Sequence, residues 1–187
     1  DRAVAAMSYA AYSYDFYSDI FGRNGFDNKG GFTSILFDTT HPDACSWNNI
    51  FEWASNGAYS YLTSIEVGTE QGMAYDVIGH EYTHSVEQST SSMLCERESG
   101  AVMEGLSDIF GELIEDYANN ATSGNPTLTG SCDWKHESRN ISNPEKSKCP
   151  AVYKGKYWKE TAEFPNEGNN YGYIHNNSTV ISHMAYL

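Results

Sequence analysis

The sequence predicts an α+β fold in which a long helix and a strand-rich segment come before a group of helices. Apolar side chains recur at helical spacing in residues 3–21. Residues 22–72 instead mix glycine, asparagine, aspartate and aromatic residues, which is typical of short strands joined by loops. Two further stretches with helical periodicity, residues 74–89 and 100–117, complete the evidence for this fold class.

Each element follows from a local pattern. The apolar stripe of the first helix consists of Val4, Met7, Ala11, Tyr14 and Ile20. In the strand-rich segment, residues 32–37 and 58–62 are the strand candidates. The apolar stripe of helix 100–117 consists of Val102, Leu106, Ile109, Leu113 and Tyr117. Residues 119–171 are rich in polar residues, glycine and proline and should form long loops, and residues 175–187 should begin one more helix.

The charge balance excludes some classes of partner. The chain has 25 acidic and 11 basic residues and a formal net charge of −14. A surface this negative repels phosphate backbones, so we expect no nucleic acid partner. No apolar run approaches the roughly 20 residues that span a bilayer, so we expect no membrane partner either.

The cysteines and two sequence motifs favour an exported protein. Cys45, Cys95, Cys132 and Cys149 lack the spacing of a zinc knuckle and allow three disulfide pairings. The favoured pair is Cys132 with Cys149, which bracket a polar loop of sixteen residues; Cys45 with Cys95 is then possible. Glycosylation motifs begin at Asn120 and Asn140 and agree with secretion. Because the chain starts at Asp1 without an initiator methionine, we expect a processed or truncated piece.

A zinc-binding motif lies on the helix predicted at residues 74–89. His80 and His84 are separated by one helical turn, so both imidazoles can reach one metal ion. Glu81 flanks the same face and can reach a water on the metal without becoming a ligand, which makes it the natural general base. A catalytic zinc needs a third protein ligand, and Glu104 on the next predicted helix completes a set of two histidines and one glutamate. Asp108, one turn further on, can accept a proton from a ligand imidazole.

Residues 76–86 and 100–111 resemble the thermolysin family of neutral zinc metalloproteases. Residues 170–175 and 8–22 extend the resemblance, so that it spans nearly the whole chain. The resemblance implies two lobes, one β-rich and N-terminal and one mainly helical and C-terminal, with the zinc helix between them. By that comparison the chain is truncated at both ends. Residues 1–72 would be the end of the first lobe and residues 73–187 the zinc-binding helices and the start of the second.

The resemblance also implies roles for three residues outside the motif. His175 would donate a hydrogen bond to the oxyanion that forms when water attacks a peptide carbonyl, and Arg139 would bind a carbonyl of the substrate. Asn49 resembles an edge-strand asparagine that binds the substrate backbone.

Three positions depart from the family pattern. Cys95 stands where a tyrosine would assist His175, and a thiol is a weaker donor. Met103 replaces an asparagine that would orient the second ligand histidine, so His84 should be held more loosely. Asn170 replaces an aspartate, which should lower the pKa of His175 relative to the usual arrangement. These changes put normal turnover in doubt while leaving the zinc ligands and Glu81 intact.

A calcium site is expected beside the zinc site. Glu112 and Glu115 continue the carboxylate stripe of Glu104 and Asp108 along one helix face. If this helix runs antiparallel to the zinc helix, Asp76 meets Glu112 and Glu115 and forms a cluster of hard oxygen ligands. A solvated acidic face is the alternative, but the family has calcium at matching positions. A second adjacent calcium is not expected, because residues 119–125 contain no acidic residue.

The sequence therefore predicts a secreted, monomeric zinc endopeptidase that cleaves polypeptides, by resemblance with a preference for an apolar residue after the cut. One alternative is a pseudoprotease that binds zinc and peptide with little turnover. Another is an aminopeptidase of a related zinc class, which would need an acidic anchor for the substrate amine near the zinc helix; we find none.

Overall fold

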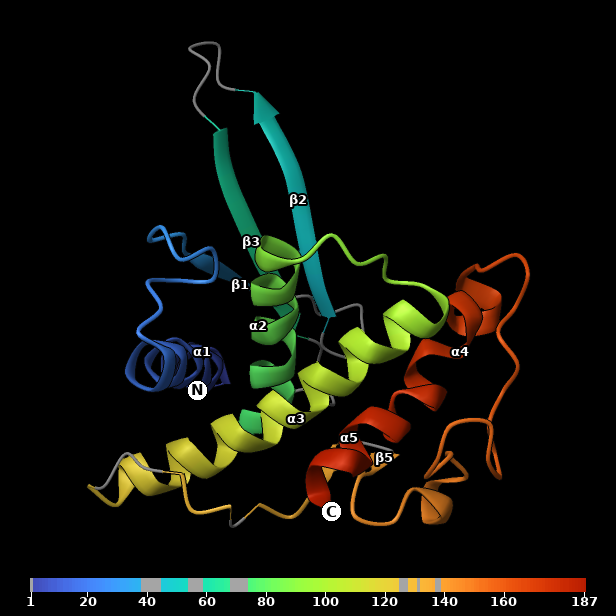
Figure 1. Ribbon diagram of the computed structural model, residues 1–187. Helices are drawn as coiled ribbons and strands as arrows, with labels where there is room; N and C mark the ends of the chain where they lie inside the picture. Colours follow the sequence, from blue (N-terminus) through green and yellow to red (C-terminus); the bar gives the residue numbers. More distant parts are fainter. Residues whose placement is uncertain are drawn as a thin grey trace.

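The computed structural model describes residues 2–37, 45–53, 59–67, 74–124, 128–130, 132–136 and 139–187; for Arg2, Phe37 and residues 45–53, 59–64 and 66 it describes the backbone alone. The elements in chain order are α1 (Arg2–Phe21), β1 (Thr33–Phe37), β2 (Cys45–Trp53), β3 (Tyr59–Val67), α2 (Tyr75–Thr90), α3 (Arg97–Thr122), β4 (Lys135–His136), β5 (Arg139–Asn140), η1 (Pro144–Ser147), η2 (Glu167–Asn169), α4 (Asn170–Asn177) and α5 (Thr179–Tyr186). The mixed fold with a mainly helical C-terminal part confirms the predicted class (Figure 1).

The N-terminal half contains a three-stranded sheet in the order β1-β3-β2. Strand β1 pairs with β3 in parallel, and β2 pairs with β3 in antiparallel fashion. Strands β1 and β3 agree with the candidates at residues 32–37 and 58–62 in the described residues, and β3 runs on to Val67. The residue pattern did not indicate β2, where only the resemblance implied an edge strand at Asn49. Its register shifts between Asn49 and Glu52, and two adjacent asparagines interrupt its apolar alternation, so the period of two that marks a strand is lost there.

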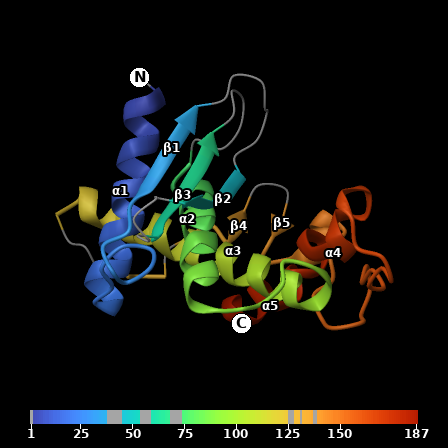
Figure 2. The ribbon, with the colours of Figure 1, turned by 90° about the horizontal axis from the view of Figure 1, so that it is seen from above.

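A shared hydrophobic core fixes α2 against α1 and β3. Phe16 of α1, Ile65 of β3, and Ile78 and Ile114 of the two long helices are fully buried. Each such side chain contributes roughly 1.5–3 kcal/mol when it leaves water. The views in Figures 1 and 2 agree that α1 and β1 lie on one side of α2 and the pair α4 and α5 on the other. The core therefore places α2 centrally.

The crossing of α2 and α3 depends on glycine. A Cβ atom on Gly111 of α3 would lie 2.5 Å from the carbonyl oxygen of Asp76, and one on Gly79 of α2 would lie 3.1 Å from Ile114. No side chain fits between the helices at Gly111, so their backbones approach closely. This approach brings the side chains one and two turns away on both helices within reach of one another.

The C-terminal part differs in detail from the prediction. Helix α3 runs on to Thr122, so the predicted loop segment begins later than residue 119. The predicted final helix is present but starts with a left-handed stretch, in which Tyr171, Gly172 and Tyr173 all have positive φ. A left-handed turn interrupts the helical pattern that sequence periodicity detects, which is why only the part from His175 onward was predicted.

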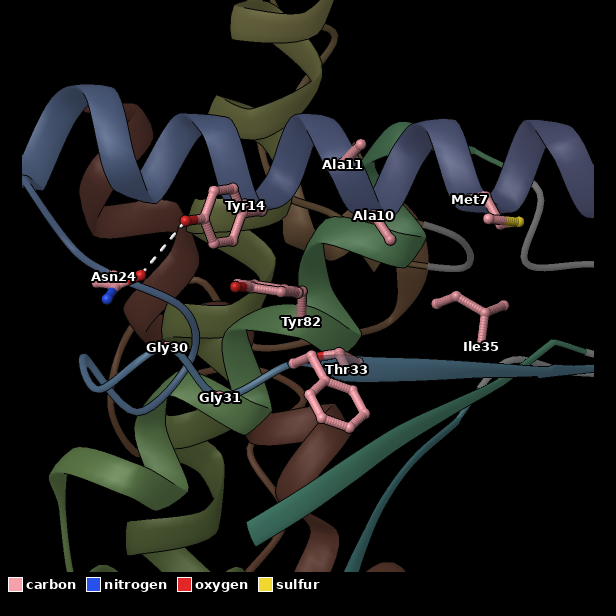
Figure 3. Close-up of a pocket in the computed structure, with 11 residues that line it drawn as sticks. Met7, Ala10, Ala11, Tyr14, Asn24, Gly30, Gly31, Thr33, Ile35 and Tyr82 are labelled. Atoms are coloured by element: carbon pink, nitrogen blue, oxygen red, sulfur yellow. Dashed lines mark hydrogen bonds between the residues drawn. The ribbon is translucent and has the colours of Figure 1, made fainter. Parts of the chain in front are cut away.

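A pocket of about 320 Å³ lies between α1, residues 24–35 and Tyr82 (Figure 3). Its lining includes Met7, Phe32 and Ile35, and the hydroxyl of Tyr14 donates to Asn24 Oδ1 at 3.4 Å. Among the described residues, its lining contains no histidine, cysteine or carboxylate that could be a metal ligand. Among the described helices, none is long and apolar enough to cross a membrane.

Candidate metal centre

Helices α2 and α3 bring the three predicted zinc ligands together. His80 and His84 come from α2 and Glu104 from α3, and each residue is less than a tenth exposed. His80 Nε2 lies 3.0 Å from His84 Nε2 and 3.4 Å from Glu104 Oε2, and His84 Nε2 lies 3.4 Å from Glu104 Oε1. Two nitrogens and a carboxylate thus converge on one point in the interior.

This geometry fits a zinc ion. The ligand atoms of a tetrahedral zinc, at bond lengths of about 2.0–2.2 Å, lie roughly 3.3–3.6 Å apart. Glu104 Oε2 is buried and makes no hydrogen bond within the described part of the chain. A buried carboxylate oxygen without a hydrogen bond is costly, and a cation between it and the two imidazoles removes that cost. The family resemblance and the donor set point to the same ion.

Asp108 and Arg139 form a buried pair behind His80. Asp108 Oδ1 lies 3.0 Å from His80 Nδ1, as predicted for a carboxylate that orients this ring. Arg139 donates from Nε and Nη2 to the two oxygens of Asp108 at 2.9 and 2.7 Å. Burial alone would raise the pKa of Asp108, but the Arg139 guanidinium, His136 and His80 together outweigh burial and hold that pKa well below its ordinary value. Asp108 therefore stays ionised beside the metal ligand.

The second ligand histidine is held by partners that the sequence did not suggest. Nδ1 of His84 lies 3.2 Å from Glu87 Oε2 and 3.1 Å from the hydroxyl of Ser107. Burial would lower the pKa of His84, but Glu104 and then Glu87 raise it well above its ordinary value. Glu87 and Ser107 thus contact the ring that an asparagine at position 103 would orient, and the looser hold expected from Met103 stays a prediction. The available signal was the position of Glu87, three residues after His84 on the same helix.

His175 lies at the edge of the centre. Its Nε2 is 3.2 Å from Glu104 Oε2, and its backbone N–H donates to Asn170 Oδ1 at 3.1 Å. The amide of Asn170 also contacts Nδ1 of the ring. The pKa of His175 is lowered, first because surrounding protein displaces water from the ring, and Arg139 and His80 add to this although Glu104 opposes it. Asn170 is not among these causes, so the effect expected from its replacement of an aspartate stays a prediction.

The residues predicted to act on water and substrate are Glu81, His175, Arg139 and Asn49. Glu81 is partly buried on α2, next to the ligand histidine, and its charge helps to raise the pKa of His84. Arg139 and His175 line one cavity of about 280 Å³ together with Asn170. Asn49 lies on β2, and its side chain is outside the described residues. The cavity next to Glu104 therefore has cationic and imidazole donors.

The predicted calcium residues lie on the far side of His80. Asp76 is buried, and its Oδ2 is 3.2 Å from Nδ1 of His136, a histidine that the sequence analysis did not single out. Glu112 Oε2 accepts from the backbone N–H of Trp134 at 3.0 Å, while its Oε1 is buried without a hydrogen bond in the described residues. Burial, followed by nearby carboxylates, raises the pKa of Glu112 to about 8 and that of Glu115 to about 6. Burial and the neighbouring negative charges therefore favour the protonated, neutral form of both carboxyls, whereas a bound cation would favour the ionised form.

Two groups in the described part of the chain bring ligand atoms within 4.8 Å of one another. One is His80, His84 and Glu104, and the other is His80, Asp108 and His136. In the second group Arg139 already neutralises Asp108, and the rings of His80 and His136 stack at 4.5 Å, so a second cation is unfavourable there. The trio of Asp76, Glu112 and Glu115 does not reach this spacing.

The predicted disulfide between Cys132 and Cys149 is wrong for this structure. Both are free thiols, and Cys95 is free as well. The two predicted partners lie in different surroundings. Cys132 is near Glu112 and Asp116 of α3, whereas the charges acting on Cys149 come first from Arg139 and Lys159. Bracketing a loop in sequence does not bring two thiols together when each end packs on a different element. The side chain of Cys45 is outside the described residues.

Comparisons with known proteins agree with this geometry. The family described as Thermolysin metallopeptidase, catalytic domain, matches residues 1–88, and Thermolysin metallopeptidase, alpha-helical domain, matches residues 91–187. The chain is 34% identical over 197 residues to a bacillolysin of Bacillus cereus and 32% identical over 204 residues to a thermolysin of Alicyclobacillus acidocaldarius. In both cases 99% of this chain is covered.

The chain spans about a third of the length of these relatives, 31% of the first and 32% of the second. Among solved structures, the precursor of protealysin, a metalloproteinase from Serratia proteamaculans, has the same fold. Its TM-score is 0.74 at 23% identity, over all of this chain and 58% of that one. Family match, relatives and fold all agree, so the chain belongs to the thermolysin family of metallopeptidases, whose members use a catalytic zinc.

Proposed function

We propose that the protein is a zinc-dependent endopeptidase and that His80, His84 and Glu104 hold the zinc. The observation behind this proposal is the convergence of two imidazole nitrogens and one carboxylate at 3.0–3.4 Å in the buried crossing of α2 and α3. When bound there, zinc supplies Lewis acidity that lowers the pKa of water and polarises a peptide carbonyl.

The side chains around the centre would transfer the protons, stabilise the oxyanion and bind the substrate. We infer that the Glu81 carboxylate takes a proton from the attacking water and passes it to the leaving amine. His175 Nε2 donates to the oxyanion as charge develops. Arg139, held by Asp108 and lining the cavity of His175, donates to a substrate carbonyl, and Asn49 on β2 binds the substrate backbone. Asp108 fixes the ring of His80.

We further propose the setting in which these residues act. The substrates are polypeptides, cleaved before an apolar residue, and the protein is a secreted monomer that binds neither nucleic acid nor membrane. The net charge of −14 and the two glycosylation motifs support this setting. Residues 1–72 then belong to one lobe and residues 73–187 to the next, with the zinc between them.

The competing proposal is a pseudoprotease, because Cys95 and Asn170 replace family residues around the oxyanion site. We expect the full-length protein to cleave a quenched peptide that is blocked at both ends and has an apolar residue after the scissile bond. Blocked termini exclude aminopeptidase action. Binding of this peptide by the zinc-loaded protein without cleavage would favour the pseudoprotease instead.

We also propose that Asp76, Glu112 and Glu115 bind calcium. The buried and unpartnered Oε1 of Glu112 and the raised pKa values of Glu112 and Glu115 support a cation at this cluster. Calcium at a hundred times its Kd should stabilise the zinc-loaded protein by about 2.7 kcal/mol. That corresponds to a rise in Tm of several degrees, which thermal unfolding with and without calcium measures.

The calcium effect should depend on pH in a defined direction. The folded-state pKa of Glu112, about 8, exceeds its ordinary value of 4.5, so protonation stabilises the fold below about pH 4.5 and this contribution is lost as pH rises through 8. Without calcium the protein should therefore be less stable at pH 8 than at pH 6, and calcium should raise the Tm more at pH 8. Glu112→Gln should remove most of the calcium response. Equal melting temperatures with and without calcium at pH 8 would show that the cluster binds no calcium.

A further inference from the structure

The two ligand histidines are oriented by different carboxylates. His80 contacts Asp108, whose charge is shared with Arg139 in a bidentate pair. His84 contacts Glu87, which lies on the same helix one turn later. In both rings Nε2 faces the metal centre and Nδ1 faces the carboxylate. The two contacts therefore have the same geometry, but an arginine neutralises the carboxylate of Asp108 and none among the described residues is paired with that of Glu87.

We propose that Glu87 is the positioning residue of the second zinc ligand, acting together with Ser107. This inference rests on the proposed zinc site. Nδ1 of His84 donates to Glu87 Oε2 at 3.2 Å, and the hydroxyl of Ser107 lies 3.1 Å from the same nitrogen and donates to Glu87 Oε2 at 3.3 Å. The three groups form a closed network from both helices. It fixes the tautomer of His84 with the lone pair of Nε2 toward the metal.

Burial shows that Glu87 is not an ordinary surface carboxylate. The residue is 8% exposed, and its second oxygen, Oε1, is buried without a hydrogen bond in the described part of the chain. Burial of such a group lowers the stability of the fold unless a positive charge compensates it. No lysine or arginine among the described residues forms an ion pair with Glu87. A cation bound to Nε2 of His84 would supply the compensating positive charge, which the imidazole ring transmits to Glu87 through Nδ1.

The unshared charge of Glu87 has a consequence for the metal. A carboxylate that accepts from Nδ1 makes the imidazole a more basic ligand. Arg139 offsets the negative charge of Asp108 and so weakens this effect on His80, whereas no arginine in the part of the chain that the structure describes offsets the charge of Glu87. Glu87 should therefore strengthen zinc binding mainly through His84. Loss of a carboxylate partner of a metal-ligating histidine typically lowers metal affinity 10–100-fold.

Zinc affinity of the full-length protein tests this proposal. Apo-protein is titrated with zinc against a chromophoric chelator for the wild type, Glu87→Gln and Glu87→Leu. We expect Glu87→Leu to bind zinc about 10–100-fold more weakly than the wild type. Glu87→Gln has the shape of glutamate and keeps one acceptor oxygen, so its zinc affinity should fall less. Glu98→Gln is the matched control, since Glu98 is exposed on α3 and accepts from the hydroxyl of Tyr153 at 2.8 Å; its zinc affinity should not change.

Thermal unfolding of the metal-free proteins separates positioning from structure. Removal of a buried carboxylate with an unpartnered oxygen should leave the Tm of the metal-free protein unchanged or raise it, while zinc binding weakens. Wild-type zinc affinity in both Glu87 variants would overturn the inference and leave the zinc site in place. A lower Tm of metal-free Glu87→Gln with full zinc affinity would also overturn it. A wild type that binds no zinc would instead remove the proposed function itself.

Discussion

Substitution of Glu81 by glutamine should reduce peptide cleavage by about a hundred- to ten-thousand-fold while the protein keeps its zinc. Glutamine has the shape of glutamate but cannot take a proton from water or pass one to the leaving amine. Glu81 is adjacent to His80 in sequence, yet the converging ligand atoms belong to His80, His84 and Glu104. The metal site should therefore survive the substitution. Cleavage rates and zinc content are measured on the same preparations.

The control for Glu81→Gln is again Glu98→Gln, which makes the same chemical change on an exposed part of α3. It should retain both zinc and cleavage. Near-normal cleavage by zinc-loaded Glu81→Gln would exclude Glu81 as the general base. Loss of zinc from Glu81→Gln would instead place its carboxylate among the ligands, contrary to the geometry of the three converging residues.

Substitution of His84 by alanine should remove zinc and activity together. The variant loses one of three protein ligands, and it leaves Glu87 and Glu104 without the imidazole that both carboxylates contact. Two buried carboxylates without that partner repel each other and destabilise the fold. We expect zinc content near zero after dialysis against a weak chelator, with cleavage below detection.

His183→Ala is a suitable control for this variant. His183 lies on α5, and its Nδ1 contacts the carbonyl oxygen of Ile141 at 2.7 Å, away from the metal centre. This variant should keep about one zinc per chain. If His84→Ala kept the same amount, the metal would be held by other residues and the assignment of His84 would fail.

The proposed zinc ligands could be selected from the sequence because their arrangement is mostly local. A spacing of four residues on a helix places His80 and His84 on one face, and this holds whatever surrounds the helix. Glu104 could be added because a zinc site needs a third ligand and the next helix offers one. The structure then brings all three within 3.4 Å, through a crossing that Gly111 permits.

Partners that depend on tertiary packing could not be predicted. The role of Arg139 toward a substrate carbonyl was expected, but its pairing with Asp108, thirty-one residues away in sequence, was not. His136 reaches Asp76 and stacks on His80 from β4, a two-residue strand that is too short to show a periodic pattern. The residue pattern did not indicate strand β2 because its register shift and its asparagine pair hide the alternation. These contacts are set by how elements pack, which no local pattern encodes.

The most direct test of the central claim follows cleavage of the doubly blocked peptide as zinc is returned to stripped full-length protein. The proposed site predicts no cleavage without metal, and a rate that rises with added zinc and levels off at about one zinc per chain. His84→Ala in the same titration should show no rise. Full cleavage by protein that contains no metal, or no cleavage at one bound zinc per chain, would contradict the proposal that His80, His84 and Glu104 hold a catalytic zinc.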